Sequence, residues 1–460
     1  MNSAPFFTTS PFDQKNLQEY FHHSDAEIEV KLRQIHSSWV ELREDSISLR
    51  AERLRKLAGV LRKEAPLLAQ MMTAEMGKPI ADSLAEVEKS AGTCEYVSDQ
   101  LPAWIEDQVG GDQTSRFKIL KQSWGPILAV MPWNYPLWQL IRVAAPAIGI
   151  GNPIVLKHAN SVAGSAEIIE RIFSQVDPRL LTNLRLTHEQ VEKVILDSRI
   201  RAVTLTGSER AGKSVAEVAG RVLKKTVLEL GGSDAYLVLA DADIEQAAMS
   251  CARARMENNG QSCIAAKRFV VEESVLESFL ESFSRAIIEM KRGDPALPAT
   301  RLGPLASGKF RKSLLQQCEN LEKLGAKKIF EAESFPEFSL NHPGAFFPAR
   351  IYRADPEIQA HFQEELFGPV ALVFAFKTMP EALGIANNTP YGLGGAIFSE
   401  DLDRAEQWAK NLDCGMVAIN SQLKSDARRP FGGVKNSGYG RELGLYGFNE
   451  FCNIKSLVLS

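Results

Sequence analysis

The sequence IVLKHANSVAGSAEIIERIFSQV, residues 154–176, contains the pattern that decides the fold. Its first part, Ile154 to His158, is an apolar run of strand length, and a helix is predicted from Ser161 to Val176. Strands alternating with helices of this length predict a parallel sheet covered by helices on both faces. In the flanking sequence, strands are predicted over residues 116–123, 127–131, 180–186, 202–206 and 226–230, and helices over 188–197 and after residue 208.

The first hundred residues are predicted to be largely helical. Ser24 and Glu27 have the spacing of a capping box, which predicts a helix through about Leu42. Pro66 is expected to begin a new helix and Gly77 to end it. The helices predicted after the first one span residues 46–63, 66–77 and 80–107.

A second alternating stretch is predicted over residues 235–420. It includes a strand at 268–271 and a long helix over 274–290. We expect a domain boundary near Gly232. A last strand, predicted over 451–459, could pair with another chain.

Composition excludes several classes of function. The 460 residues, 45% hydrophobic and 24% charged, indicate a globular protein with more than one core. The formal net charge of −4 and the absence of a long basic run argue against nucleic acid or an anionic membrane as a partner. The most apolar window, residues 125–141, contains three prolines and polar residues, so it is predicted to be a buried strand and turn.

The six cysteines form no C-x-x-C pair, and the seven histidines lack metal-ligand spacing. We therefore expect a reducing, cytoplasmic location and no metal site. Residues 1–11 lack the charged and apolar regions of a secretory signal.

Cys263 is the first candidate for chemistry. It ends the polar segment Asn258-Asn259-Gly260-Gln261-Ser262, between a predicted helix and a predicted strand. A thiolate is a strong nucleophile when its surroundings stabilise the anion or a neighbouring base accepts the proton. Taken alone, packing as a small hydrophobic residue is the commoner fate of a cysteine. Other residues must therefore decide.

Three further positions are candidates because of where they stand. Glu229 ends an apolar strand, a costly place for a carboxylate unless it faces a cleft or is paired in a salt bridge. Asn134 lies between two prolines in an aromatic turn, although a turn asparagine often bonds its own backbone. Gly207-Ser208, between a strand and a helix, could present backbone N–H groups to a phosphate, but such a pair also caps ordinary helices.

Six motifs, in order, resemble those of the aldehyde dehydrogenase superfamily over about residues 51–455. They are Pro132-Trp133-Asn134, Thr206-Gly207-Ser208, Leu228-Glu229-Leu230-Gly231-Gly232, Gly260-Gln261-Ser262-Cys263, Glu365-Leu366-Phe367-Gly368-Pro369 and Pro430-Phe431-Gly432-Gly433-Val434-Lys435-Asn436-Ser437-Gly438. The resemblance implies an α/β fold with a Rossmann-type cofactor domain, an α/β catalytic domain and a small β oligomerisation arm. The implied bounds are 1–108 and 125–232 for the cofactor domain, 233–445 for the catalytic domain, and 109–124 and 446–460 for the arm.

The resemblance also implies a mechanism. The Cys263 thiolate would add to an aldehyde carbon, and the amide of Asn134 with the backbone N–H of Cys263 would bind the oxyanion of the thiohemiacetal. Hydride would pass to a nicotinamide. Glu229 would then activate the water that hydrolyses the thioester.

By the same resemblance the cofactor is NAD or NADP. Lys157 would contact the adenosine ribose or its phosphate, Ser208 the pyrophosphate and Glu365 the nicotinamide ribose. Asn160 stands where many NAD-preferring relatives have glutamate, so NADP is predicted to be tolerated. The remaining predicted cofactor-site residues are Trp133, Gly207, Leu230 and Phe367.

Ser425-Asp426-Ala427-Arg428 resembles the bacterial succinate semialdehyde dehydrogenases, which implies succinate semialdehyde as the substrate. Arg142 stands where members of that branch often have an arginine that could hold a distal carboxylate in a bidentate pair. An ordinary helix-surface arginine is the alternative. Glu257 replaces a second arginine of the branch, and Arg255, Arg428 or Ser425 could substitute for it. Tyr135, Trp138 and Ser425 complete the predicted substrate site.

Other functions stay open at this point. A broad aliphatic aldehyde dehydrogenase would need no carboxylate anchor, and a thioesterase or esterase could use Cys263 and Glu229 without hydride transfer. A non-catalytic binding protein is disfavoured because Cys263, Glu229 and Asn134 are all present. We expect a homodimer or a dimer of dimers, because the implied arm would hide an exposed sheet edge.

Overall fold

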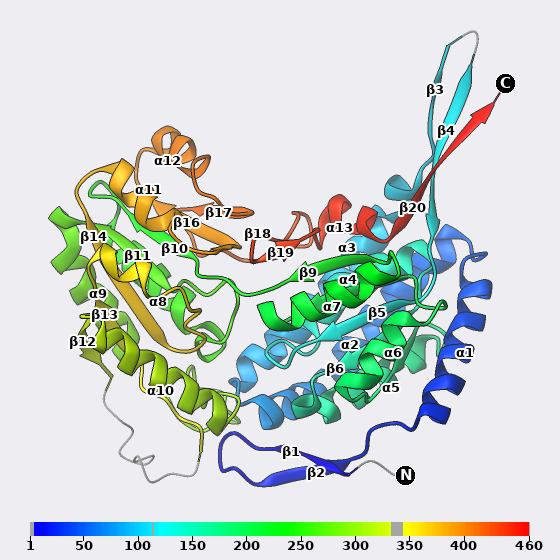
Figure 1. The fold of residues 1–460 in the computed structure, drawn as a ribbon, viewed down its shortest axis with the longest axis horizontal. Helices are drawn as coiled ribbons and strands as arrows, with labels where there is room; N and C mark the ends of the chain where they lie inside the picture. The colour runs from blue at the N-terminus through cyan, green and yellow to red at the C-terminus, as the bar shows by residue number, and fades with distance from the viewer. Residues whose placement is uncertain (1–3, 113–114, 333–343, 460) are drawn as a thin grey trace.

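The chain builds two separate, largely parallel sheets with helices on both faces of each, which confirms the predicted α/β class (Figure 1). The computed structural model describes residues 4–112, 115–332 and 344–459. The strand order is β19-β9-β8-β5-β6-β7 in the first sheet and β12-β13-β14-β11-β10-β16-β17 in the second. Neighbouring strands are parallel except at β19 beside β9 and β12 beside β13.

The first sheet follows the predicted strands closely. Alternate residues of β5 explain its two covered faces, because Ile127 and Ala129 pack into one core cluster and Leu128 into another. One face is covered by α2, α3, α4 and α5, and the other by α1, α6 and α7. The strands are β5 (Ile127–Met131), β6 (Ile154–His158), β7 (Leu181–Asn183), β8 (Ala202–Thr206), β9 (Lys225–Glu229) and β19 (Gly438–Tyr439).

The helices of this part begin with α1, whose predicted capping box at Ser24 and Glu27 is confirmed. The predicted break at Pro66 is wrong, because α2 continues through it as one helix. Proline removes one backbone hydrogen bond, but the fully buried Leu61 and Leu68 on either side keep the helix packed against its neighbours. The helices are α1 (Asp25–Leu42), α2 (Ile47–Met76), α3 (Ile80–Ile105), α4 (Trp138–Ile150), α5 (Ala163–Val176), α6 (His188–Leu196) and α7 (Glu209–Arg221).

The second sheet is likewise covered on both faces. In β11, Phe269 and Val271 pack with α8 and α9, and Val270 packs with α10, α11 and α12 on the opposite face. Its strands are β10 (Ala235–Val238), β11 (Arg268–Glu272), β12 (Lys327–Glu331), β13 (Arg350–Arg353), β14 (Val370–Phe376), β16 (Gly394–Phe398) and β17 (Met416–Ile419). Its helices are α8 (Ile244–Met256), α9 (Leu276–Ile288), α10 (Gly308–Lys323), α11 (Met379–Asn387) and α12 (Leu402–Ala409).

Three smaller sheets complete the fold. An N-terminal hairpin of β1 (Phe6–Thr9) and β2 (Asn16–Tyr20) was not predicted. Short strands β15 (Tyr391–Gly392) and β18 (Val434–Lys435) pair near the junction of the two large sheets, and helix α13 (Gly444–Glu450) leads to the last strand.

The third small sheet contains β3 (Gln108–Gly111), β4 (Arg116–Ser123) and β20 (Cys452–Leu459), in the order β20-β4-β3, and it projects away from the body (Figure 1). It falls in the segments predicted as the arm, of which residues 113–114 and 460 lie outside the described residues. Within the described part of the chain, no helix combines the length and apolar character needed to cross a bilayer.

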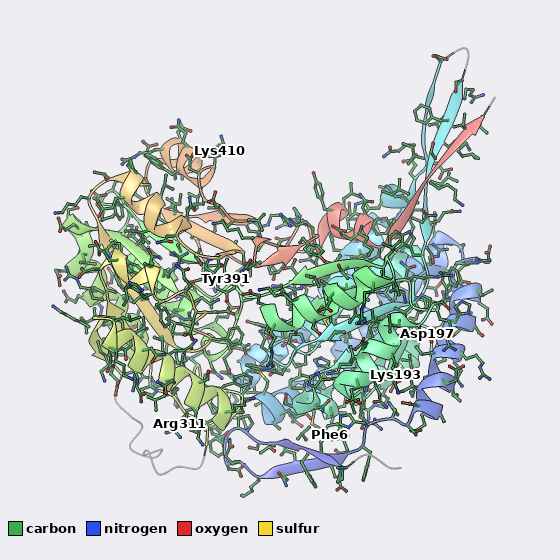
Figure 2. All side chains as sticks on the ribbon, viewed as in Figure 1. Phe6, Lys193, Asp197, Arg311, Tyr391 and Lys410 are labelled. Carbon is green, nitrogen blue, oxygen red and sulfur yellow. The ribbon has the colours of Figure 1, made fainter. Side chains whose placement is uncertain are left out.

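The two large sheets meet end to end. In the first sheet the chain moves outward from β5 to β6 and β7 and then returns to place β8 on the other side of β5, which makes a topological switch point at the carboxyl ends of β5 and β8. The loops at these ends face the loops that precede β10, β11 and β14 of the second sheet, since residues from both sets line a common cavity. Tyr391 lies at this junction (Figure 2).

Candidate active site

Three consecutive residues with left-handed backbone lead the chain to Cys263. Asn258, Asn259 and Gly260 have φ angles of 54°, 60° and 74°. Non-glycine residues in this conformation cost about 1–3 kcal/mol each, and asparagine is among the few that adopt it. A Cβ at position 260 would lie only 2.4 Å from the carbonyl carbon of Gly368, so only glycine fits there.

Side-chain hydrogen bonds hold this turn. The Asn259 amide donates to the carbonyls of Gly77 and Pro304 at 3.0 and 2.9 Å, and its oxygen accepts from the N–H of Gly303 at 2.7 Å. The Asn258 amide donates to the carbonyl of Asn134 at 2.8 Å. At roughly 1 kcal/mol for each bond, these contacts are of the size needed to offset the backbone strain.

The turn brings Cys263 to the wall between two cavities. The larger, of about 620 Å³, is lined by residues from α3, α4, α8 and the segment around Ser425. The smaller, of about 420 Å³, is lined by the loops after β5, β8 and β9 and by α10. Cys263 and Gln139 line both cavities. A molecule in either cavity can therefore reach the same sulfur.

The surroundings of the Cys263 thiol favour its protonated form. Burial raises the pKa of Cys263 to about 12, although Arg142 and Lys267 act in the opposite direction. Lys267 is fully buried, and its ammonium group donates to the carbonyls of Ser262 and Cys263 at 2.9 and 2.5 Å and pairs with Glu365 at 3.1 Å. The thiol of the ligand-free protein thus needs a proton acceptor before it can act as a nucleophile.

Asn134 lines the smaller cavity together with Cys263. Its amide nitrogen donates to the carbonyl of Gln261 at 3.0 Å, and its oxygen accepts from the side chain of Gln139 at 3.1 Å. The two bonds fix which end of the amide is the donor. Because the nitrogen carries two hydrogens and one is engaged, the second can be offered to a ligand oxygen.

Glu229 is the last residue of β9 and lines neither cavity. It is buried, and among the described residues neither carboxylate oxygen has a hydrogen-bond partner. Burial raises the pKa of Glu229 well above its usual value, the neighbouring Glu442 raises it further, and Arg142 lowers it. Such a carboxyl can hold a proton near neutral pH. It must turn toward Cys263 to act on a group bound there.

The predicted cofactor residues fall into two groups. Trp133 and Phe367 form an edge-to-face pair with ring centres 5.8 Å apart, and Glu365 accepts from the N–H of Gly232 at 3.2 Å. Lys157 and Asn160 do not line the smaller cavity; the Asn160 amide lies 3.1 Å from the ring nitrogen of His22, which follows the N-terminal hairpin. The predicted residues that do line it are Trp133, Gly207, Ser208, Leu230, Glu365 and Phe367.

The predicted substrate residues Tyr135, Trp138, Arg142 and Ser425 all line the larger cavity. The helix-surface alternative for Arg142 is wrong, because this residue is buried, forms an ion pair with Glu442 at 2.6 Å and lies over the ring of Phe431. Its charge is therefore already compensated.

The suggested replacements for the second arginine do not lie in this cavity, apart from Ser425. Arg255 is buried and donates to the carbonyl of Gly260, and Arg428 pairs with Asp426. Glu257 does line the cavity, where its carboxylate accepts hydrogen bonds from the hydroxyl of Tyr135 and the amide of Gln422.

Comparison with known proteins agrees with this geometry. Residues 2–457 match the aldehyde dehydrogenase family. The chain belongs to that family.

Several aldehyde dehydrogenases are similar to this protein over nearly the whole length of its chain. A probable succinate-semialdehyde dehydrogenase (NADP(+)) of Synechocystis sp. is 39% identical over 455 residues, which is 98% of this chain and 99% of the relative. A succinate semialdehyde dehydrogenase (NAD(P)+) of Escherichia coli (strain K12) is 42% identical over 433 residues, or 94% and 93% of the two chains. The crystal structure of succinic semialdehyde dehydrogenase from Streptococcus pyogenes with NADP+ superposes with a TM-score of 0.94 at 36% identity and covers 98% of this chain and 99% of that one.

Sequence reasoning did not predict three residues of this aldehyde dehydrogenase site, Lys267, Gln139 and Glu442. Lys267 could have been suspected, because a lysine next to an apolar strand and close behind the candidate nucleophile must find a buried partner. Gln139 and Glu442 gave no local signal. Their contacts with Asn134 and Arg142 depend on how helix α4 packs against the rest of the site.

We expect the ligand-free thiol of Cys263 to react slowly with iodoacetamide at pH 7, and the rate to rise about tenfold per pH unit toward pH 9, because thiolate increases as pH approaches the raised pKa. Mass spectrometry of the peptide carrying Cys263 would measure this. Cys263→Ala serves as the control, because Cys414 is also partly accessible. A rate independent of pH in this range would mean that the thiolate is already formed.

Proposed function

We propose that this protein oxidises an aldehyde that carries a carboxylate, with succinate semialdehyde as the best candidate, to the corresponding acid with NAD or NADP. The observation that carries the proposal is that Cys263 lies in the wall shared by two cavities, one of a size for a small substrate and one beside the phosphate-binding type of helix start. Membership of the aldehyde dehydrogenase family and the activities named for the relatives support it.

In this proposal Cys263 is the nucleophile. The thiol first gives up its proton to solvent water in the cavity. Its sulfur then adds to the aldehyde carbon, and the second amide hydrogen of Asn134 is donated to the oxyanion that forms. A bound nicotinamide supplies the hydride acceptor, and loss of hydride leaves a thioester on the sulfur. Glu229 then takes the proton of the water that hydrolyses this thioester; because burial raises its pKa well above the usual value, it must first lose its own proton to solvent.

The smaller cavity suits a dinucleotide. Trp133 and Phe367 offer aromatic walls, and Ser208 caps α7 at the point where the first backbone N–H groups of that helix are exposed. Glu365, fixed by Lys267 and the N–H of Gly232, is available to a ribose hydroxyl. We assign the unit built on the first sheet, residues 1–108 and 125–232, to cofactor binding, and residues 233–445 to catalysis.

NADP is expected to be tolerated, since Asn160 places no negative charge where a 2′-phosphate would approach Lys157. Relatives are named for NADP(+) and for NAD(P)+. The cytoplasmic location stays a prediction.

An aldehyde panel tests the function. With succinate semialdehyde, butanal, propanal and benzaldehyde, each assayed with NAD and NADP, we expect acid and reduced cofactor in equal amounts and the highest kcat/KM for succinate semialdehyde. Equal kcat/KM values for butanal and succinate semialdehyde would favour the broad aliphatic alternative. Strict use of NAD would contradict the cofactor prediction, and ester cleavage with no reduced cofactor from any aldehyde would favour the thioesterase alternative.

Glu229→Gln should stop the second half of the reaction. We expect one equivalent of reduced cofactor per active site in a rapid burst, followed by a steady state slower than wild type by about 10²–10⁴, because the water loses its base. Stopped-flow absorbance of the reduced nicotinamide measures both phases, and Glu406→Gln, on the exposed face of α12, is the matched control. A burst lost together with the steady state would assign Glu229 an earlier role.

We further propose that the projecting sheet joins subunits into a dimer or a dimer of dimers. β20 forms one edge of that sheet and exposes Ile454, Leu457 and Val458. An exposed apolar edge strand is a ready surface for pairing with another chain.

Replacing Leu457 and Val458 together by lysine should reduce the mass found by light scattering at micromolar concentration, because charges would be buried in the interface. Leu402→Lys, which changes an exposed leucine on α12, should leave the mass of the wild type. A monomeric wild-type protein would contradict the proposal.

A further inference from the structure

Five basic side chains line the larger cavity: Lys89, Arg142, Arg253, Arg301 and Lys424. Lys89 differs from the others by its contact with the ring of Trp138, which belongs to the same apolar cluster as Cys263. Arg142 is compensated by Glu442, and Arg255 and Arg428 lie outside the cavity. Lys89, in the middle of α3, lines it. The contacts of its ammonium group are with the hydroxyl of Ser425, to which it donates at 2.7 Å, and with the ring of Trp138, whose centre is 4.3 Å away. Neither partner carries a negative charge.

The surroundings of Lys89 are those of a binding group. Its side chain is exposed to solvent and lines the cavity. Desolvation lowers the pKa of Lys89 to about 8, and the nearby carboxylate of Glu257 limits the decrease. The ammonium is therefore mostly protonated at pH 7, and its positive charge attracts an anion that enters the cavity.

Trp138 connects this cation with the reaction centre. The ring belongs to the small apolar cluster that also contacts Cys263, together with Phe431 and Leu443. An aldehyde whose carbonyl carbon lies at the sulfur can pass its methylene groups across the indole ring. Its far end then meets the ammonium of Lys89 and the hydroxyl of Ser425.

We propose that Lys89, with Ser425, binds the carboxylate of the substrate and selects aldehydes that carry a carboxylate at the end opposite the carbonyl. This inference rests on the proposed aldehyde oxidation. It assigns the carboxylate to α3 and leaves Arg142 as a positioning residue held by Glu442 beside Glu229.

Asp82, Glu86, Glu257 and Glu289 all line this cavity, and Glu257 acts most strongly on the charge of Lys89. Its carboxylate accepts from Tyr135 at 3.2 Å and from Gln422, so two donors already stabilise its charge. A substrate carboxylate at Lys89 would still be repelled by it. Replacing Glu257 by glutamine should therefore strengthen binding of the anionic aldehyde, whereas replacing Lys89 should weaken it.

The test compares aldehydes of equal length and different charge in the full-length enzyme. For Lys89→Met we expect the ratio of kcat/KM for succinate semialdehyde to that for butanal to fall at least about tenfold, mainly through KM. The corresponding ratio for 4-aminobutanal, which is cationic, should rise. Lys89→Arg should restore most of the preference for the anion. Lys410→Met, which removes the exposed lysine directly after α12 (Figure 2), should reproduce the wild-type ratios.

Two outcomes would overturn the assignment. If Lys89→Met lowers kcat/KM equally for all three aldehydes, the residue only supports the loop at Ser425. If Arg142→Ala lowers the anionic ratio and Lys89→Met does not, the carboxylate binds at Arg142. Failure of the proposed function is recognised separately, because the wild-type enzyme would then show no preference for succinate semialdehyde over butanal.

Discussion

The site depends on a strained turn that is held from outside itself. Asn258, Asn259 and Gly260 take a backbone conformation that is unfavourable for most residues, and the bonds that compensate the strain come from the chain before α3, from the loop after β5 and from the segment at Gly303 and Pro304. The position of Cys263 is thereby tied to the packing of the first unit on the second. Because both units contribute to the turn, a small rotation between them would move the sulfur relative to both cavities.

Burial governs the charges around the sulfur. Buried Lys267 pairs with the partly exposed Glu365 beside the smaller cavity, and Arg142 and Glu442 form a fully buried pair beside the larger one. In a low-dielectric interior each pair is costly to break, so these four groups form a fixed electrostatic frame. Glu229 differs from them, since its oxygens have no partner in the described structure. A carboxyl without fixed bonds can move, and the role proposed for Glu229, as a base at the thioester, requires such movement.

The sequence predicted the elements whose signals are local. The four parallel strands β5, β6, β8 and β9 and the capping box at Ser24 follow from residue spacing alone. The segment around Cys263 is by itself compatible with a packed cysteine, and only the distant motifs taken together indicate that it is the nucleophile. The continuous helix through Pro66 could not be predicted, because tertiary packing decides it. The ion pair between Arg142 and Glu442 could not be predicted either, because it joins α4 to the distant segment just before α13.

Substitutions in the two cavities differ in how strongly they disturb the backbone around Asn134 and Cys263. The cofactor cavity is built from loops at strand ends of both sheets, so a substitution there disturbs the backbone that holds Asn134 and Cys263. The larger cavity is instead lined in part by side chains of α3, α4 and α8, whose backbones are fixed by their own helical hydrogen bonds. A side chain on such a helix can be exchanged while the thiol stays in place. Selectivity for the far end of the aldehyde can therefore change while the chemistry at its carbonyl is preserved, which is the physical reason to look for specificity on α3 and α8.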